Sequence, residues 1–339
     1  MHRREFLKSA AALGLASAAS SCSRPKLWKA EAYRKEPQSQ VAILRTGSYD
    51  ADLVSLIIDG LKSYSLVVKG KRVLLKPNLV EYERDTVINT HPALIGAAIE
   101  AFRRQGAAEV VVAEGPGHRR DTDGLLLSSG LLPHLKATGT EFVDLNLDET
   151  QCISLSSRYM GVDSLFFPAS VLRCDLLVSM PKIKTHHWAG MTLSLKNLFG
   201  IMPGVHYGWP KNFLHWRGIH ESIVDISSTV CPHFVIADGV VCMEGNGPIQ
   251  GKAKRCGVLV MGDDPVAVDA TCVRIAGLHP EAIDYLAIAG QFLGNLEESK
   301  IRQIGDPISA VLSLFAVIES FVYLKSYGLG TLSLRLCRN

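Results

Sequence analysis

Short apolar runs alternate with longer stretches of helical period along most of the chain. The apolar runs are rich in valine, isoleucine and leucine and contain few polar positions, a pattern typical of strands buried on both faces. The predicted strands are 41–44, 73–75, 110–113, 142–145, 176–179, 234–237 and 258–261. The predicted helices are 52–61, 91–105, 124–137, 217–228, 265–276 and 280–289. This alternation predicts an α/β domain with a mainly parallel open sheet and helices on both faces.

The N-terminal segment 1–21 carries a separate signal. Arg3 and Arg4 precede a mildly apolar stretch, an arrangement that resembles a twin-arginine (Tat) export signal. The alternative is a basic amphipathic helix that stays on the protein. Cleavage is expected after Ala18, or before Cys22 with lipidation of that cysteine. The signal predicts export by the Tat machinery to the periplasm or the outer face of the membrane, with membrane attachment only if Cys22 is lipidated.

Composition divides the rest of the chain into three parts. Residues 22–40 are polar and contain two prolines, which suits a linker. Residues 41–300 form the predicted α/β domain, and 301–339 form a C-terminal tail. Within this tail, 308–324 is strongly apolar but is shorter than the roughly 20 residues of a membrane-spanning helix. We therefore expect a helix that packs on the domain or on another subunit, in preference to a membrane span.

Composition and charge exclude several classes of protein. Of the 339 residues, 47% are hydrophobic and 20% are charged, so a disordered chain or a coiled-coil rod is not expected. The net charge is +3, of which Arg3, Arg4 and Lys8 minus Glu5 contribute +2. A nearly neutral domain predicts no nucleic-acid partner. The 8 cysteines contain no C-x-x-C pair, so neither a zinc site nor a ferredoxin-type iron–sulfur cluster is expected.

Polar and charged residues follow several predicted strands. The segments are Lys76-Pro77-Asn78, Glu114-Gly115-Pro116-Gly117, Lys182-Ile183-Lys184-Thr185-His186-His187, Asp238-Gly239 and Gly262-Asp263-Asp264-Pro265. In open α/β sheets, ligands bind beyond the carboxyl ends of the strands. The sequence therefore predicts one edge of the sheet that gathers lysines, carboxylates, histidines and glycines.

These segments also resemble a known family, the domain of unknown function DUF362 of bacteria and archaea, over about residues 41–290. The matching segments are 74–80, 90–92, 114–117, 180–186, 193–200, 238–248 and 264–269. Some members of the family carry a ferredoxin-type cysteine cluster, which this sequence lacks. The resemblance implies no particular reaction.

The lysines of these segments predict binding of a small anionic molecule. The expected binding residues are Lys76, Asn78, Lys182, Lys184, Lys196 and Asn197. Two alternatives remain: Lys-Pro-Asn after a strand is also ordinary turn chemistry, and the lysines could form a solvated face. His186 lies beside the lysines in sequence and is a candidate for proton transfer or for a structural histidine.

The glycine-rich segment 238–248 predicts a turn that holds Asp238, Glu244 and Asn246. Two carboxylates and an amide oxygen suit a divalent metal such as Mg²⁺ or Mn²⁺. Two alternatives remain open: the segment is a purely structural turn, or the same carboxylates, with His186, are catalytic acid or base residues. Asp264 before Pro265 is the pattern of a helix start.

Taken together, the sequence favours an exported enzyme that acts on an anionic small molecule in a cleft of lysines, carboxylates and histidine. A non-catalytic periplasmic protein that binds a ligand or cofactor is the alternative. A catalyst needs a titrating group beside its ligand, whereas a binder needs only the cations, and the sequence contains candidates for both.

Overall fold

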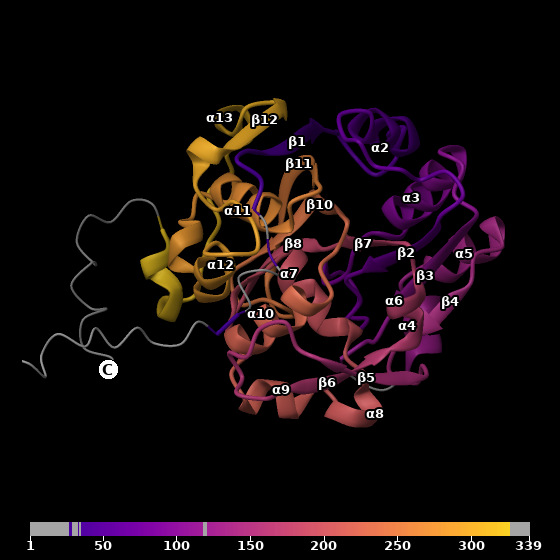
Figure 1. Cartoon of the computed structure of the whole chain (residues 1–339). Helices are drawn as coiled ribbons and strands as arrows, with labels where there is room; N and C mark the ends of the chain where they lie inside the picture. The colour runs from indigo at the N-terminus through magenta and orange to yellow at the C-terminus, as the bar shows by residue number, and fades with distance from the viewer. Residues whose placement is uncertain (1–26, 29–32, 34, 118–120, 326–339) are drawn as a thin grey trace, which may run out of the picture.

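A ten-stranded sheet forms the centre of the computed structural model, which describes residues 27–28, 33, 35–117 and 121–325 (Figure 1). Eight strands follow the order β12-β1-β11-β10-β7-β2-β3-β4, and β8 and β9 branch from β10. Their bounds are β1 Ser39–Arg45, β2 Arg72–Pro77, β3 Glu109–Glu114, β4 Phe142–Asp144, β7 Leu176–Met180, β8 Lys182–His186, β9 Gly190–Thr192, β10 Phe234–Glu244, β11 Lys252–Gly262 and β12 Ile301–Gly305.

Most of this sheet is parallel, as predicted, with β11 as the main exception. Parallel pairing joins β10, β7, β2, β3 and β4 in turn, and also joins β1 to β12. Strand β11 runs antiparallel to both β1 and β10, because the loop 245–251 connects it directly to β10 as a hairpin. The carboxyl end of β11, at Gly262-Asp263-Asp264, therefore lies at the opposite edge from the ends of β2, β3 and β7. The expectation that it joins them was wrong.

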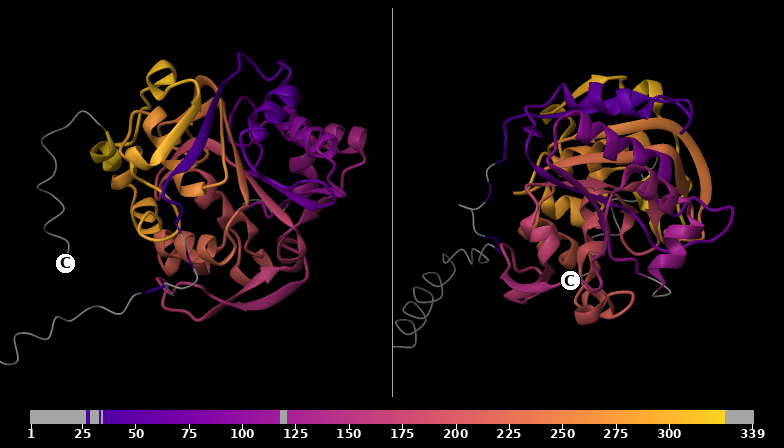
Figure 2. Two further views of the ribbon diagram at one scale, coloured as in Figure 1. Left: turned by 45° about the horizontal axis from the view of Figure 1, so that its top comes forward. Right: turned by 90° about the vertical axis from the view of Figure 1, so that its right-hand side faces the viewer.

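Helices cover both faces of the sheet, so the predicted fold class is confirmed (Figure 2). One hydrophobic cluster joins the sheet to α2 Leu53–Leu61, α3 Pro92–Arg104, α4 Thr122–Ser128 and α5 Leu131–Thr138. The other joins it to α6 Ala169–Arg173, α7 Ser194–Asn197, α10 Ile219–Thr229, α11 Pro265–Ile275 and α12 Asp284–Ala289. Adjacent strand residues contribute to opposite clusters: Leu74 to the second and Leu75 to the first. This alternation explains why the strand runs are continuously apolar.

Side-chain caps start several of these helices. His91 accepts a hydrogen bond from the amide of Ala93 at the start of α3, and Asp264 accepts from the amides of Val266 and Ala267 at the start of α11. The expected cap at Asp264 is therefore confirmed. The single helix predicted over 124–137 is instead α4 and α5, which are separated at Gly130 with φ +79°. A left-handed residue of this kind ends a helix.

The glycine-rich segment 238–248 differs from its prediction. Residues Asp238–Glu244 continue strand β10, with an irregularity of register between Gly239 and Val241. Only the residues after Glu244 form the loop to β11. The turn expected to gather Asp238, Glu244 and Asn246 is therefore absent, because pairing with β8 and β11 extends the strand.

Several elements were missing from the sequence-based expectation. A separate two-stranded sheet pairs β5 Thr150–Ser154 with β6 Ser164–Pro168, and short helices α8 Gly204–Tyr207 and α9 Asn212–Trp216 precede α10. The described residues also contain four 3-10 turns, at Leu198–Ile201, Pro280–Ala282, Glu298–Lys300 and Glu319–Leu324.

The tail beyond residue 300 is not one helix. It begins with strand β12, continues with α13 Ile308–Val311 and ends, in the part described, with the 3-10 turn Glu319–Leu324. Between them Val317 forms a bridge with Gly245. None of the described helices has the length and apolar character needed to cross a bilayer.

Near the other end, Trp28 stacks on Phe292 with ring centroids 4.8 Å apart, and Tyr33 contacts the same ring edge-on. Part of the segment predicted as a linker therefore packs on the domain. The twin-arginine segment, Ala18 and Cys22 lie outside the described residues.

Candidate functional site

Strand β8 carries a row of buried polar side chains. Lys182, Lys184 and His186 are 1%, 0% and 6% exposed. Residues two apart on a strand lie on the same face, so these three form one line beside β10. The sequence predicted all three as site residues, and the structure places them together.

The Lys182 ammonium group has all of its hydrogen-bonding capacity in use. Its Nζ donates to Asp238 Oδ2 at 2.6 Å, to the Tyr49 hydroxyl at 2.9 Å and to the Val241 carbonyl at 3.0 Å. An ammonium group has three N–H bonds, so none remains for a ligand. Tyr49 also donates to Asp238 Oδ1 at 2.7 Å, and the amide of His91 donates to Oδ2 at 2.9 Å. Asp238 therefore holds together the loop after β1, the start of α3 and strand β8.

Lys76 at the end of β2 is equally saturated. Its Nζ donates to Glu114 Oε2 at 2.6 Å, to Asn197 Oδ1 at 2.9 Å and to the Pro77 carbonyl at 3.1 Å. Glu114 also accepts from the amides of Leu79 and Gly115. Gly200 packs directly on this ion pair, since a Cβ there would lie 2.6 Å from Lys76 Nζ and would also collide with Glu114.

Three further lysines have N–H bonds to spare among the described residues. Lys184 Nζ donates only to the Ile88 carbonyl, at 2.7 Å, although the side chain is fully buried. Lys211 Nζ donates to the Gly115 carbonyl at 3.1 Å and to Asn146 Oδ1. Lys196 is half-buried, and its Nζ contacts the Phe199 ring at 4.5 Å without a carboxylate partner in this part of the chain. Each of these three ammonium groups can therefore donate to a further acceptor.

The charges of these lysines act on one another. Burial and the neighbouring Lys196 and Lys182 place the pKa of Lys184 well below its usual value. Burial and Lys76 lower the pKa of Lys196 to about 7, and burial lowers that of Lys211 to about 8. The residues therefore share one neighbourhood in which positive charge exceeds negative charge.

The two histidines after Lys184 differ in tautomer. His186 Nδ1 accepts from the amides of Trp188 and Ala189, so Nε2 carries the ring proton of the neutral imidazole. Burial and the adjacent Lys196 hold the pKa of His186 well below its usual value. His187 Nδ1 lies 2.8 Å from the Gly247 carbonyl and must donate to it, since a carbonyl only accepts. Neutral His186 thus offers an N–H donor next to the spare lysine donors.

The other predicted site residues lie in different surroundings. Glu244 accepts from the Ala316 amide and lies 3.5 Å from Lys254, and Asn246 contacts Gln250. They share no hydrogen-bond partner with Asp238, and the described chain contains no cluster of three His, Cys, Asp or Glu side chains suited to a metal. Asn78 is buried and its Oδ1 accepts no hydrogen bond from the described residues, whereas Asn197 fixes Lys76.

Asp269 on α11 positions the segment that carries Lys196. Its carboxylate accepts from the amides of Ser194 at 2.7 Å and Leu195 at 3.0 Å, the first residues of α7. Burial raises the pKa of Asp269 to about 8. The group therefore acts on the site through α7.

The raised pKa of Asp269 predicts a pH-dependent stability. The pKa of Asp269 is higher in the folded state than in the unfolded state. The contribution of Asp269 to stability is therefore fully present below about pH 4 and is lost as the pH rises to about 8. Asparagine does not titrate, so the Asp269→Asn variant does not lose stability in this way. Its free energy of unfolding, relative to that of the wild type, should therefore rise by up to about 1.4 kcal/mol per pH unit over that window. Urea denaturation across the window measures this difference, and parallel pH profiles would contradict it.

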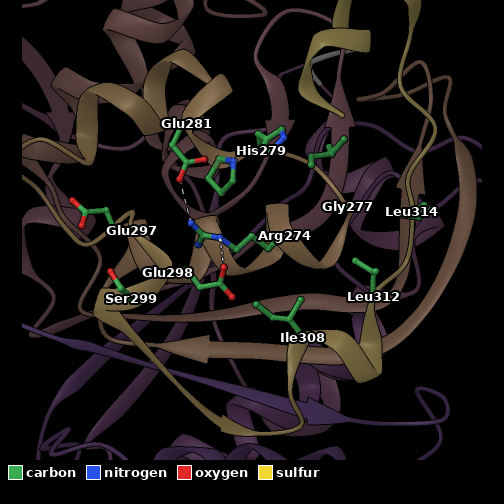
Figure 3. Close-up of a pocket in the computed structure, with 12 residues that line it drawn as sticks. Arg274, Gly277, His279, Glu281, Glu297, Glu298, Ser299, Ile308, Leu312 and Leu314 are labelled. Atoms are coloured by element: carbon green, nitrogen blue, oxygen red, sulfur yellow. Dashed lines mark hydrogen bonds and ion pairs between the residues drawn. The ribbon is translucent and has the colours of Figure 1, made fainter. Parts of the chain in front are cut away.

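Two of the cavities on the described surface are relevant to the site. One, of about 430 Å³, is lined by Tyr49, Tyr82, Thr90, His91 and Lys182 among others, and borders the segment whose Ile88 carbonyl binds Lys184. The larger, of about 660 Å³, lies beside the end of α11 (Figure 3). There Arg274 lies 3.3 Å from Glu281 and 3.8 Å from Glu298. Its acidic lining does not suit an anion, and it shares no residue with the lysine site.

The chain matches the family model described as "Domain of unknown function (DUF362)" over residues 73–274, and it belongs to this family. That range includes the described site except Tyr49. A relative is the "Thylakoid-associated protein sll1697" of Synechocystis sp., which is 29% identical over 255 residues that cover 73% of this chain and 77% of the relative.

Two solved structures show distant similarity. The lactate racemase apoprotein of Thermoanaerobacterium thermosaccharolyticum has 16% identity and a TM-score of 0.43, covering 70% of this chain and 57% of that one. A protein of Thermotoga maritima has 11% identity and a TM-score of 0.38, covering 68% and 59%. The chain thus spans less than two thirds of each.

Sequence reasoning missed Tyr49 and Lys211. Tyr49 lies in the loop after β1, in a segment with no polar motif, and Lys211 follows Pro210 at a positive φ of 69°. His91 lies within a segment that resembled the family, yet only the structure shows that its amide binds Asp238.

Proposed function

We propose that the protein is an enzyme that binds a small anionic molecule beside Lys184, Lys196 and Lys211. The observation that supports this is the imbalance of charge and hydrogen bonding. Lys76 and Lys182 use all three N–H bonds on internal partners, with Glu114 and Asp238 as their carboxylates, while the other three lysines retain spare donors. Clustered ammonium groups with spare donors are stabilised by an anion that accepts from them.

Lys196 favours an enzyme over a simple binder. A lysine with a pKa of about 7 exchanges its proton readily at neutral pH, the property required of an acid or base catalyst. His186, with its Nε2 proton, is the second candidate to donate to the substrate. Asp238 and Glu244 have structural partners in the fold, so we assign them no catalytic step here.

A non-catalytic anion-binding protein is the second candidate. It is supported by the saturation of Asp238 and Glu114, which leaves neither of these two buried carboxylates available as an acid or base. Export through the Tat route, with a periplasmic location, is part of both proposals and rests on the twin-arginine segment. A divalent metal held by Asp238, Glu244 and Asn246 has no support in the geometry.

Sulfate binding tests the site, because sulfate stays doubly charged across the relevant pH range. We expect calorimetry to detect binding that weakens as the pH rises through about 7, since Lys196 then loses its charge. Lys196→Gln should weaken binding by about 1–3 kcal/mol at low pH, the range for hydrogen bonds to a charged group. Lys196→Arg should keep the affinity at higher pH, because arginine stays protonated.

The matched control is Lys62→Gln, an exposed lysine that pairs with Asp59 on α2. It should leave the sulfate affinity unchanged. If the wild type binds neither sulfate nor phosphate, or if Lys196→Gln binds as well as Lys62→Gln, the proposal is wrong.

A further inference from the structure

The hairpin of β8 and β9 presents an exposed tryptophan next to the lysine site. The register pairs His186 with Gly190, so the loop consists of His187, Trp188 and Ala189. Gly190 has a φ of +78°, the left-handed conformation that closes a three-residue hairpin loop. Trp188 at the middle of this loop is 56% exposed.

Hydrogen bonds to the His186 side chain fix the backbone around Trp188. His186 Nδ1 accepts hydrogen bonds from the amides of both Trp188 and Ala189, at 3.1 and 3.2 Å. The exposed indole is therefore held on a rigid loop. An indole that is exposed to solvent stabilises the fold less than a buried one would. A large ring that is held rigidly in solvent is, however, well suited to binding.

Ring contacts lead from this tryptophan to the lysine site. His187 and His215 contact the indole nearly edge-on, at interplanar angles of 82° and 68°. His215 in turn contacts Phe199 at 4.9 Å, and Lys196 Nζ lies 4.5 Å from the Phe199 ring. A series of ring contacts thus runs from the exposed Trp188 through His215 to the buried Phe199, and it ends at the ammonium group of Lys196.

We infer that the anion bound at the lysine site carries a planar aromatic ring, which stacks on Trp188 while its charged group binds Lys196. The inference rests on the proposed function, since it extends the ligand of the same site. A ring stacks on an indole through dispersion and the ring quadrupole, and the lysines neutralise the attached anion. Nucleotides and aromatic phosphates or carboxylates share this chemistry.

A pair of probes separates the ring from the anion. AMP and ribose 5-phosphate carry the same sugar and phosphate and differ in the base. We expect AMP to bind about 5- to 150-fold more tightly in calorimetry, the range for stacking one base on an aromatic side chain. AMP should also quench tryptophan fluorescence, and ribose 5-phosphate should not.

Trp188→Leu should remove the advantage of AMP and leave the affinity for ribose 5-phosphate unchanged. Trp216→Leu is the matched control, because Trp216 is 83% exposed and makes no ring contact within the described chain. Phenyl phosphate, which has no ribose, distinguishes nucleotides from other aromatic anions.

Equal binding of AMP and ribose 5-phosphate by the wild type would overturn this inference and leave the anion site intact. An AMP advantage that survives Trp188→Leu would overturn it as well. If neither probe binds and sulfate does not bind, both the inference and the proposed function fall.

Discussion

Glu114→Gln should lower the free energy of unfolding by about 3–5 kcal/mol, the cost of removing one partner of a buried ion pair. The Lys76–Glu114 pair is 1% exposed on both sides, and Glu114 is the only carboxylate that Lys76 contacts among the described residues. The substitution keeps the shape and leaves the Lys76 ammonium group with only neutral acceptors in the interior. Urea denaturation followed by circular dichroism measures the loss.

Glu109→Gln is the control, since Glu109 lies on the same strand and pairs with Arg72 at 3.0 Å, but its side chain is 47% exposed. Exposed pairs contribute about 0–1 kcal/mol, so this variant should remain close to the wild type. Equal losses of unfolding free energy in the two variants would contradict a larger contribution from the buried pair.

Asp238→Asn should destabilise the protein by a similar amount, about 3–5 kcal/mol. Its carboxylate accepts from Lys182 Nζ, the Tyr49 hydroxyl and the His91 amide. An amide keeps the shape but has one acceptor oxygen and loses the charge that neutralises Lys182. We also expect weaker anion binding, because the loop after β1 and the start of α3 lose their common anchor.

Glu244→Gln provides the contrast on the same strand. Glu244 is 19% exposed and lies 3.5 Å from Lys254, so its replacement should change the stability by about 1 kcal/mol or less. Thermal melts of both variants separate the cases. If Asp238→Asn melts like the wild type, Asp238 is not the structural anchor that its four hydrogen bonds indicate.

The sequence predicted the elements of the fold well where hydrophobic burial alone decides them. Runs such as 73–75 and 110–113 lie in the interior of the sheet, and their boundaries agree with β2 and β3 within a few residues. The extension of β10 through Asp238 was missed, because its polar and glycine residues are paired by β8, an element without an apolar signal.

The sequence grouped four of the site's lysines, but it did not predict their division of roles and it missed Tyr49 and Lys211. Lys76, Lys182, Lys184 and Lys196 lie in one neighbourhood, as their positions after strands indicate. Which lysines keep spare donors depends on partners such as Tyr49 and Asn197, which are distant in sequence. Hydrogen-bond saturation is a property of the tertiary structure, so no spacing rule predicts it.

The pairing of β1 with β12 has a consequence for the order of folding. Ser39 lies opposite Ile301 in this parallel pair, so two strands near the two ends of the described chain form one border of the sheet (Figure 1). Contacts of such sequence separation form late, because a large chain loop must be closed first. During synthesis, almost the whole domain must therefore be made before β12 can pair with the outer edge of β1. Until then its unpaired amides and carbonyls are open to strands of other molecules, which makes this border the place where a nascent chain needs protection.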